Sequence, residues 1–191
     1  MKKFPGRRAM SNKARGVMEA ALLADGMAPK DMYPFNLARA FKALDRIKPG
    51  VASWAAASPQ FIILLQTGES DFRQHLIASR RQRRRAAASL SPLSFDQTKI
   101  FSSDLAVIKG APNKENAMKL IAYFFRPEVQ VRLESQAGLI PASKKAAAML
   151  PAESRKWQPD LSSPDHLIND SAYWADNFEA VTNRFKEWIQ S

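Results

Sequence analysis

Apolar side chains recur along most of the chain at intervals of three and four residues, the spacing of a helix with one buried face. This pattern predicts long helices at 11–24, 36–47, 58–65, 115–125, 128–136 and 172–190, and two short ones between 142 and 157. Glycine or proline follows several of these stretches, as expected where helices end. Helices therefore account for most of the predicted structure.

Short apolar runs between the predicted helices indicate β-strands. Residues 51–56 form one such run, and Leu105–Ile108 forms a second, bounded by Asp104 and Gly110, which predicts a short buried strand. A predicted helix follows each run, and a tight polar loop separates the second run from its amphipathic helix. Strand, loop and helix in this order predict an α/β fold in which helices dominate.

The composition argues against an enzyme and against a metal or cofactor site. The 191 residues include no cysteine, and the two histidines, His75 and His166, are not paired by any spacing. Glycines are scattered without a phosphate-binding pattern, and no two acids are placed as a catalytic pair. We therefore expect no catalytic residue, no metal and no cofactor. In addition, no apolar run is long enough to span a membrane.

The net charge of +11 is concentrated in one place. Residues 73–85 contain six arginines and no acid, which leaves +5 for the rest of the chain. An exposed block at Arg80–Arg85 would bind phosphates of nucleic acid or an anionic surface. A small basic interaction protein is therefore the alternative function. Because no aromatic residues are interleaved for base stacking, nucleic acid is the less favoured partner.

Two long segments resemble a known family. They are ALLADGMAPKDMYPFNLARAFKALDRIKP at 21–49 and SDLAVIKGAPNKENAMKLIAYFFRPEVQ at 103–130. Both are similar to the extracellular solute-binding proteins of ABC importers, and the most similar branch is the spermidine/putrescine type. The resemblance covers nearly the whole chain except residues 73–94.

The resemblance implies a fold like a type II periplasmic binding protein, with the second lobe and the C-terminal helices present and the first lobe largely missing. Residues 1–138 would form an incomplete α/β solute-binding lobe, and 139–191 a helical segment that returns toward the missing lobe. The implied function is capture of a small solute and its delivery to the membrane subunits of an ABC permease, without covalent chemistry. Because only one of the two lobes that form the ligand cleft would be present, we expect solute binding to be impaired.

The family is periplasmic, but the N-terminal MKKFPGRRAM lacks the apolar core of a secretion signal. Taken literally, the chain would stay in the cytoplasm. The missing secretion signal is explained if an internal codon serves as the start. This is our hypothesis because the family has an extended segment at this point. Residues 73–94 also depart from the family, and a one-base frameshift is the favoured hypothesis over a genuine arginine-rich helix.

The candidate ligand-binding residues come from two regions of the predicted fold. Asp104 stands where polyamine binders have an aspartate that pairs with a ligand ammonium, but Ser102 replaces their tryptophan. Lys13 and Gly16 replace two ligand-binding acids, so a small polar, zwitterionic or anionic solute fits better than a polyamine. The candidates are Trp54, Ser58, Gln60, Ser102, Ser103, Asp104 and Trp174.

Trp54, Ser58 and Gln60 are candidates because they lie between a strand end and a helix start, where α/β proteins bind ligands. Trp54 also fits a core position. Trp174 begins the last helix and would line the cleft.

Overall fold

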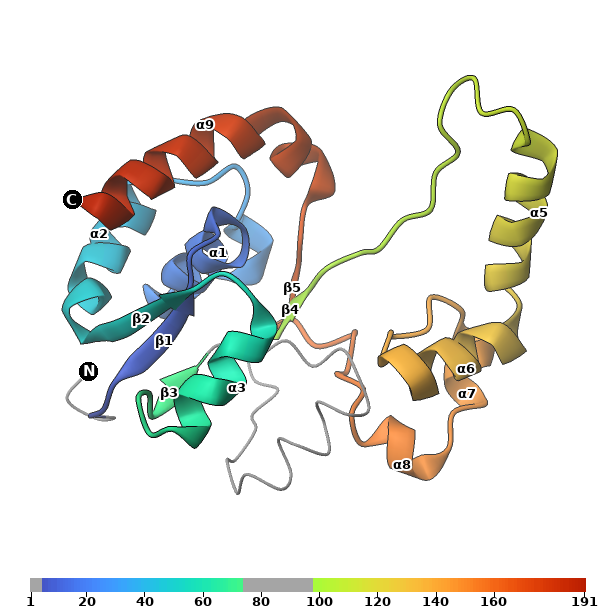
Figure 1. Cartoon of the computed structure of the whole chain (residues 1–191), viewed down its shortest axis with the longest axis horizontal. Coiled ribbons are helices and arrows are strands. Elements are labelled where there is room, and N and C mark those ends of the chain that lie inside the picture. The colour runs from blue at the N-terminus through green and yellow to red at the C-terminus, as the bar shows by residue number, and fades with distance from the viewer. Residues whose placement is uncertain (1–4, 74–97) are drawn as a thin grey trace. The chain divides into compact units, whose positions relative to one another are not determined.

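The computed structural model describes residues 5–73 and 98–191, and these divide into two compact units (Figure 1). The first unit comprises the described residues up to 73, together with 98–102 and 161–191, and the second comprises 103–160. The chain therefore leaves the first unit after Ser102 and returns to it at Leu161. The boundary expected after residue 138 falls inside the second unit.

A three-stranded parallel sheet forms the centre of the first unit, in the order β2–β1–β3. The strands are β1 (Arg8–Ser11), β2 (Val51–Ala55) and β3 (Phe72–Arg73). Met10 pairs with Trp54 and Arg8 with Phe72, so β1 is hydrogen-bonded on both sides. The sequence predicted β2, whereas β1 was expected only as an extended segment.

Helices connect these parallel strands, as crossover connections must. They are α1 (Ala14–Ala24), α2 (Leu37–Ile47) and α3 (Ser58–Gln66), with single 3₁₀ turns η1 (Pro29–Asp31) and η2 (Lys48–Gly50). Asn36 caps α2, because its Oδ1 accepts a hydrogen bond from the Arg39 backbone N–H at 3.0 Å. The three predicted helices of this region are confirmed within a few residues.

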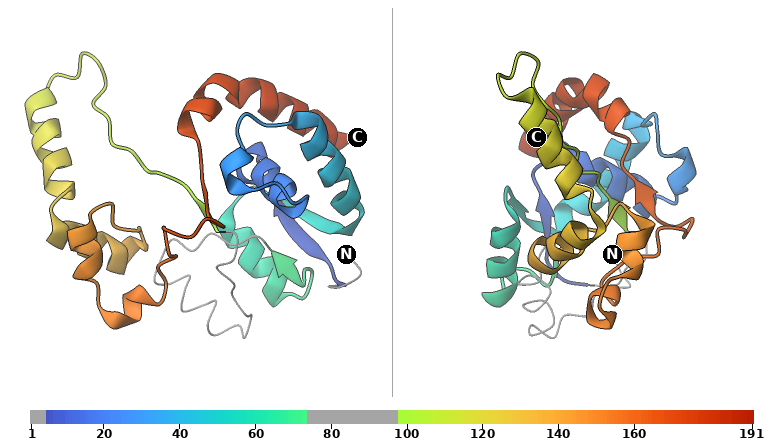
Figure 2. Two further views of the ribbon diagram at one scale, coloured as in Figure 1. Left: turned by 180° about the vertical axis from the view of Figure 1, so that it is seen from behind. Right: turned by 90° about the vertical axis from the view of Figure 1, so that its right-hand side faces the viewer.

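The C-terminal segment completes the core of the first unit. β4 (Lys99–Ile100) pairs in parallel with β5 (Leu167–Ile168), and α9 (Ser171–Gln190) follows. Asp170 caps α9, since its Oδ1 accepts the Tyr173 N–H at 2.9 Å. α9 lies along α1 and closes the core (Figure 2). Its buried side chains are Trp174, Val181 and Phe185.

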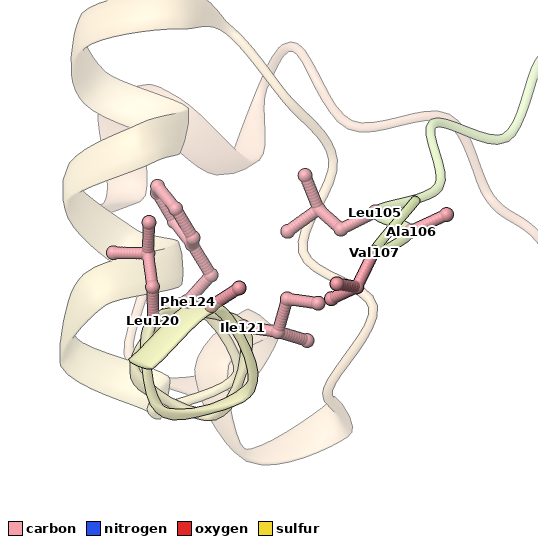
Figure 3. Close-up of a pocket in the computed structure, with 7 residues that line it drawn as sticks. Leu105, Ala106, Val107, Leu120, Ile121 and Phe124 are labelled. Atoms are coloured by element: carbon pink, nitrogen blue, oxygen red, sulfur yellow. The ribbon is translucent and has the colours of Figure 1, made fainter. Parts of the chain in front are cut away.

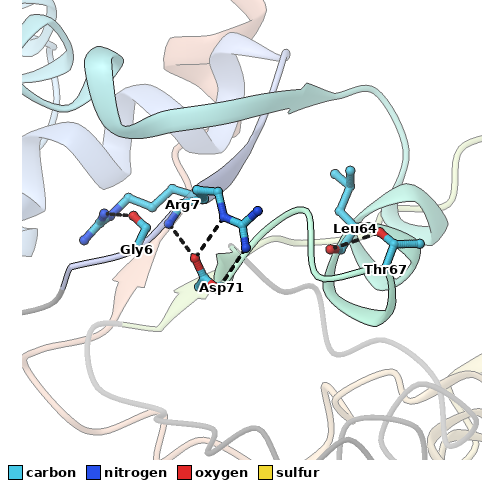
Figure 4. A network of polar contacts seen from close by, with 6 residues as sticks. Gly6, Arg7, Leu64, Thr67 and Asp71 are labelled. Carbon is cyan, nitrogen blue, oxygen red and sulfur yellow. Dashed lines mark hydrogen bonds and ion pairs between the residues drawn. The ribbon is translucent and has the colours of Figure 1, made fainter.

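An ion pair ties β3 to the start of β1 (Figure 4). The Arg7 backbone N–H donates to Asp71 Oδ2 at 2.7 Å, and the Arg7 guanidinium donates to both carboxylate oxygens at 3.3 and 3.4 Å. The backbone hydrogen bond and the guanidinium together lower the pKa of Asp71 below its usual value. Both side chains are exposed, so this pair sets local register more than it adds stability.

The second unit is helical in its described part. It contains α5 (Lys114–Phe124), α6 (Pro127–Ala137), α7 (Lys144–Ala148) and α8 (Ala152–Arg155), as the sequence predicted within a few residues. Gly138 ends α6 with a φ of 71°, a left-handed conformation that glycine adopts without strain. Val129, Ala146 and Leu150 form its few buried apolar positions.

The predicted buried strand at Leu105–Ile108 is wrong. These residues have no regular secondary structure, and Leu105 and Ile108 are 56% and 83% exposed. A strand needs a hydrogen-bonded neighbour, and none of the strands in the described part of the chain pairs with this run. The apolar pattern therefore does not by itself produce a buried strand here.

Candidate functional site

A cavity of about 160 Å³ lies in the second unit, between the run 105–107 and one face of α5 (Figure 3). Leu105 and Val107 project toward Ile121, Leu120 and Phe124 across it. The whole lining is apolar, so the cavity offers no group that would bind a charged or strongly polar solute.

A second candidate, with the chemistry that the cavity lacks, is a buried polar cluster at the start of α1 in the first unit. Glu19 is fully buried there, and its carboxylate is surrounded by donors. Oε2 accepts the Gly16 backbone N–H at 2.6 Å. Oε1 accepts from three side chains: Tyr33 Oη at 2.9 Å, Asn169 Nδ2 at 3.1 Å and Trp174 Nε1 at 2.8 Å. The carboxylate therefore joins α1 to β5 and α9.

Sequence reasoning did not single out Glu19, although a signal was present. On a helix, residue 19 shares a face with residues three and four positions later, which are Leu22 and Leu23, and both are buried. An acid on an apolar face indicates a buried carboxylate that needs partners.

The first turn of α1 is kinked next to this cluster. Gly16 has a φ of 91° and Arg15 is not helical, although the helix continues regularly afterwards. The kink places the Arg15 guanidinium against Asn169 Oδ1, to which Nε donates at 2.9 Å and Nη2 donates as well. The guanidinium also lies over the ring of Phe101, 5.4 Å from its centroid.

Lys99, in β4, faces the same cluster, and its ammonium donates to the Gly16 carbonyl. Burial lowers the pKa of Lys99 to about 8, and the negative charge of Glu19 opposes this only in part. Burial also raises the pKa of Tyr33 well above its usual value, with the Glu19 charge as the next cause. The cluster thus combines one buried carboxylate with two half-buried cations.

The pKa of Lys99 predicts that stability rises with pH between about pH 8 and pH 10. The unfolded lysine titrates near 10.4, so in this window the unfolded chain binds more protons than the folded chain. We expect urea unfolding to show a gain of about 1–3 kcal/mol across the window. Above pH 10 the raised pKa of Tyr33 acts with the opposite sign.

Two substitutions isolate this effect. Lys99→Met is expected to flatten the pH dependence, whereas Lys42→Met, at an exposed position of α2, should leave it unchanged. An equally steep rise in the Lys99→Met protein would show that other groups cause it.

The predicted site residues of the first unit lie in different surroundings. Trp54 packs against the core, with its ring 6.2 Å from Phe185. Gln60 is exposed, and its Oε1 accepts the N–H groups of Ala56 and Ala57 before α3 at 2.8 and 3.1 Å. Trp174 is buried and bonded to Glu19.

Ser58 begins α3, but its side chain lies outside the described part of the structure. Ser102 is exposed, with its Oγ 3.4 Å from Ser171 Oγ at the start of α9. Ser103 and Asp104 are exposed residues of the second unit. Residues 74–97, which include the arginine block Arg80–Arg85 and nearly all of the expected frameshift, lie outside the described residues.

The described residues contain no group of three or more histidine or acidic side chains that could hold a metal ion. No helix among them is long and apolar enough to cross a membrane.

Comparison with known proteins identifies the class of protein. Residues 1–161 match the family model of the bacterial extracellular solute-binding proteins, and the chain belongs to this family. Among curated proteins, it is 31% identical to the gamma-aminobutyric acid-binding protein of Pseudomonas aeruginosa, over 98% of this chain and 55% of that protein. It is 25% identical to spermidine/putrescine-binding periplasmic protein 1 of Haemophilus influenzae, over 98% of this chain and 51% of that protein.

Solved structures agree with this identification. An ABC transporter substrate-binding protein from Bradyrhizobium japonicum matches with a TM-score of 0.83 and 31% identity, over 98% of this chain and 59% of that chain. A GABA receptor matches with a TM-score of 0.84 and 29% identity, over 98% of this chain and 58% of that chain. The resemblance drawn from residues 21–49 and 103–130 is confirmed, and the chain has part of the α/β fold of these proteins. It spans about half the length of the curated relatives that it matches.

Proposed function

We propose that the chain takes part in capture of a small polar solute for an ABC importer, with the membrane permease as its protein partner. The observation that carries this proposal is the family match over residues 1–161, supported by the fold shared with two substrate-binding proteins. The alternative of a small basic interaction protein has no support from the relatives, because their names describe proteins that bind small solutes.

A solute with a carboxylate, such as gamma-aminobutyric acid, fits this chain better than a polyamine. Lys13 stands exposed next to the kink of α1, and Arg15 and Lys99 add positive charge to the same region. Like charges repel a polyamine, whereas they attract a carboxylate.

Isothermal titration calorimetry with gamma-aminobutyric acid and with putrescine tests this function. We expect gamma-aminobutyric acid to bind more tightly than putrescine, and more weakly than it binds the Pseudomonas relative. The reason is that the chain spans 55% of that protein, and a solute held from one side keeps much of its contact with water.

Two results would contradict the proposal in different ways. Putrescine bound as tightly as gamma-aminobutyric acid would exclude the preference for a carboxylate. Affinity equal to that of the relative would show that binding by this chain is not impaired.

A further inference from the structure

We propose that the Arg15 guanidinium is the binding site for the carboxylate of the solute, held in place by Asn169; this rests on the proposed function. Nothing in the sequence pattern indicated Arg15. The structure fixes this side chain on two sides: Asn169 Oδ1 binds one edge of the guanidinium, and the Phe101 ring covers one face. A guanidinium held in this way is ready to bind before the ligand arrives.

The side-chain amide of Asn169 cannot flip. It is buried, and its Nδ2 donates to Glu19 Oε1 at 3.1 Å and to Tyr33 Oη at 3.0 Å. In the flipped amide, Oδ1 would face the Glu19 carboxylate, which is also an acceptor. The NH2 group would face the Arg15 guanidinium, which is also a donor. Its Oδ1 must therefore point at Arg15, and the buried cluster works as the support of the guanidinium.

Arg15 forms no ion pair within the described part of the chain. The partner of its guanidinium is a neutral amide, and no carboxylate of the described residues forms an ion pair with it. By contrast, Arg39 and Arg46 both pair with Asp25. A half-buried arginine with a neutral partner retains its charge and its remaining donors for an anion, and its planar fork fits a carboxylate.

Nearby hydroxyls complete the polar surroundings. Ser102 follows Phe101, and its Oγ lies 3.4 Å from that of Ser171, which is two residues after Asn169. Because the Asp170 carboxylate already caps the N-terminus of α9, the preference for a carboxylate rests on Arg15, and the two hydroxyls add hydrogen-bond donors.

The test is an NMR titration of the Arg15 Nε–H signal in the full chain with butyrate, gamma-aminobutyric acid and putrescine at constant ionic strength. We expect saturable shifts with the two carboxylates, with dissociation constants on the order of millimolar, and none with putrescine. Arg15→Gln should weaken butyrate binding about tenfold or more, and Arg15→Lys, which keeps the charge without the fork, by less. Loss of one cross-peak in Arg15→Lys assigns the signal.

Arg184 offers a matched control, because its guanidinium also lies over an aromatic ring, 4.8 Å from the Phe41 centroid, in the same unit. Arg184→Gln should leave butyrate binding unchanged. Equal binding by the Arg15→Gln and unmodified proteins, or no shift of the Arg15 signal up to the solubility of butyrate, would overturn the inference.

The two proposals can fail separately. If gamma-aminobutyric acid binds but Arg15→Gln has no effect, the carboxylate site is wrong and solute capture stands. If butyrate binds at Arg15 and gamma-aminobutyric acid does not bind, the anion site stands and the proposed function fails.

Discussion

Replacing Glu19 with alanine is expected to lower the free energy of unfolding by about 3–5 kcal/mol. The substitution leaves the Gly16 N–H and three side-chain donors without their acceptor in a site closed to water. It also removes the negative charge nearest to the Lys99 ammonium. Urea denaturation followed by circular dichroism at pH 7 measures the loss.

Two further variants make this prediction specific. Glu19→Gln keeps the volume but turns an NH2 group toward one set of donors, so it should cost less than alanine and still clearly destabilise. Glu179→Ala, at an exposed position of α9, should stay within about 0.5 kcal/mol of the unmodified protein. A cost for Glu19→Ala as small as that for Glu179→Ala would mean that the carboxylate does not hold the unit together.

Replacing Phe185 with alanine is expected to cost about 3–5 kcal/mol of stability. The ring is fully buried and lies 6.2 Å from the Trp54 ring and 5.7 Å from the Trp188 ring, measured between centroids. Truncation leaves a cavity between β2 and α9 that rigid aromatic neighbours cannot fill. The midpoint of urea unfolding should shift accordingly, with little change in its slope.

The same helix supplies the control. Phe178 is 54% exposed, so Phe178→Ala removes the same atoms from a site that water already reaches. We expect a cost below about 1 kcal/mol. Equal costs at the two positions would show that α9 is not packed through Phe185 as the structure has it.

Helices were predictable in this chain because their signals are local. Spacing of apolar residues, capping by Asn36 and Asp170, and a left-handed glycine at 138 each act within a few residues. α2, α6 and α9 therefore have nearly the predicted bounds. The family was also recognisable, since two long segments carry its pattern.

Features that depend on distant residues were not predictable to the same degree. The central position of β1 requires pairing with both β2 and β3, and a short segment such as RAMS does not reveal this. The apolar pattern at Leu105–Ile108 indicates a buried strand, but no strand of the described residues pairs with this run. Asp104, Ser102 and Ser103 remain predictions as ligand contacts.

The Arg15 site shows the same limit. Arg15, Phe101 and Asn169 are far apart in sequence, and only the fold places the guanidinium between the other two. The buried Glu19 that supports them was visible as an acid on an apolar helix face, but its partners were not.

The return of the chain to its first unit at Leu161 has a consequence for protein synthesis. A ribosome releases β1, α1 and α2 early, yet the indole of Trp174 and the ring of Phe185 that cover them come from α9, more than a hundred residues later. Until α9 has emerged, the carboxylate of Glu19 lacks the Asn169 and Trp174 donors and the apolar face of α1 stays exposed. The nascent first unit therefore cannot complete its core before α9 is made, and its exposed apolar face favours aggregation until then.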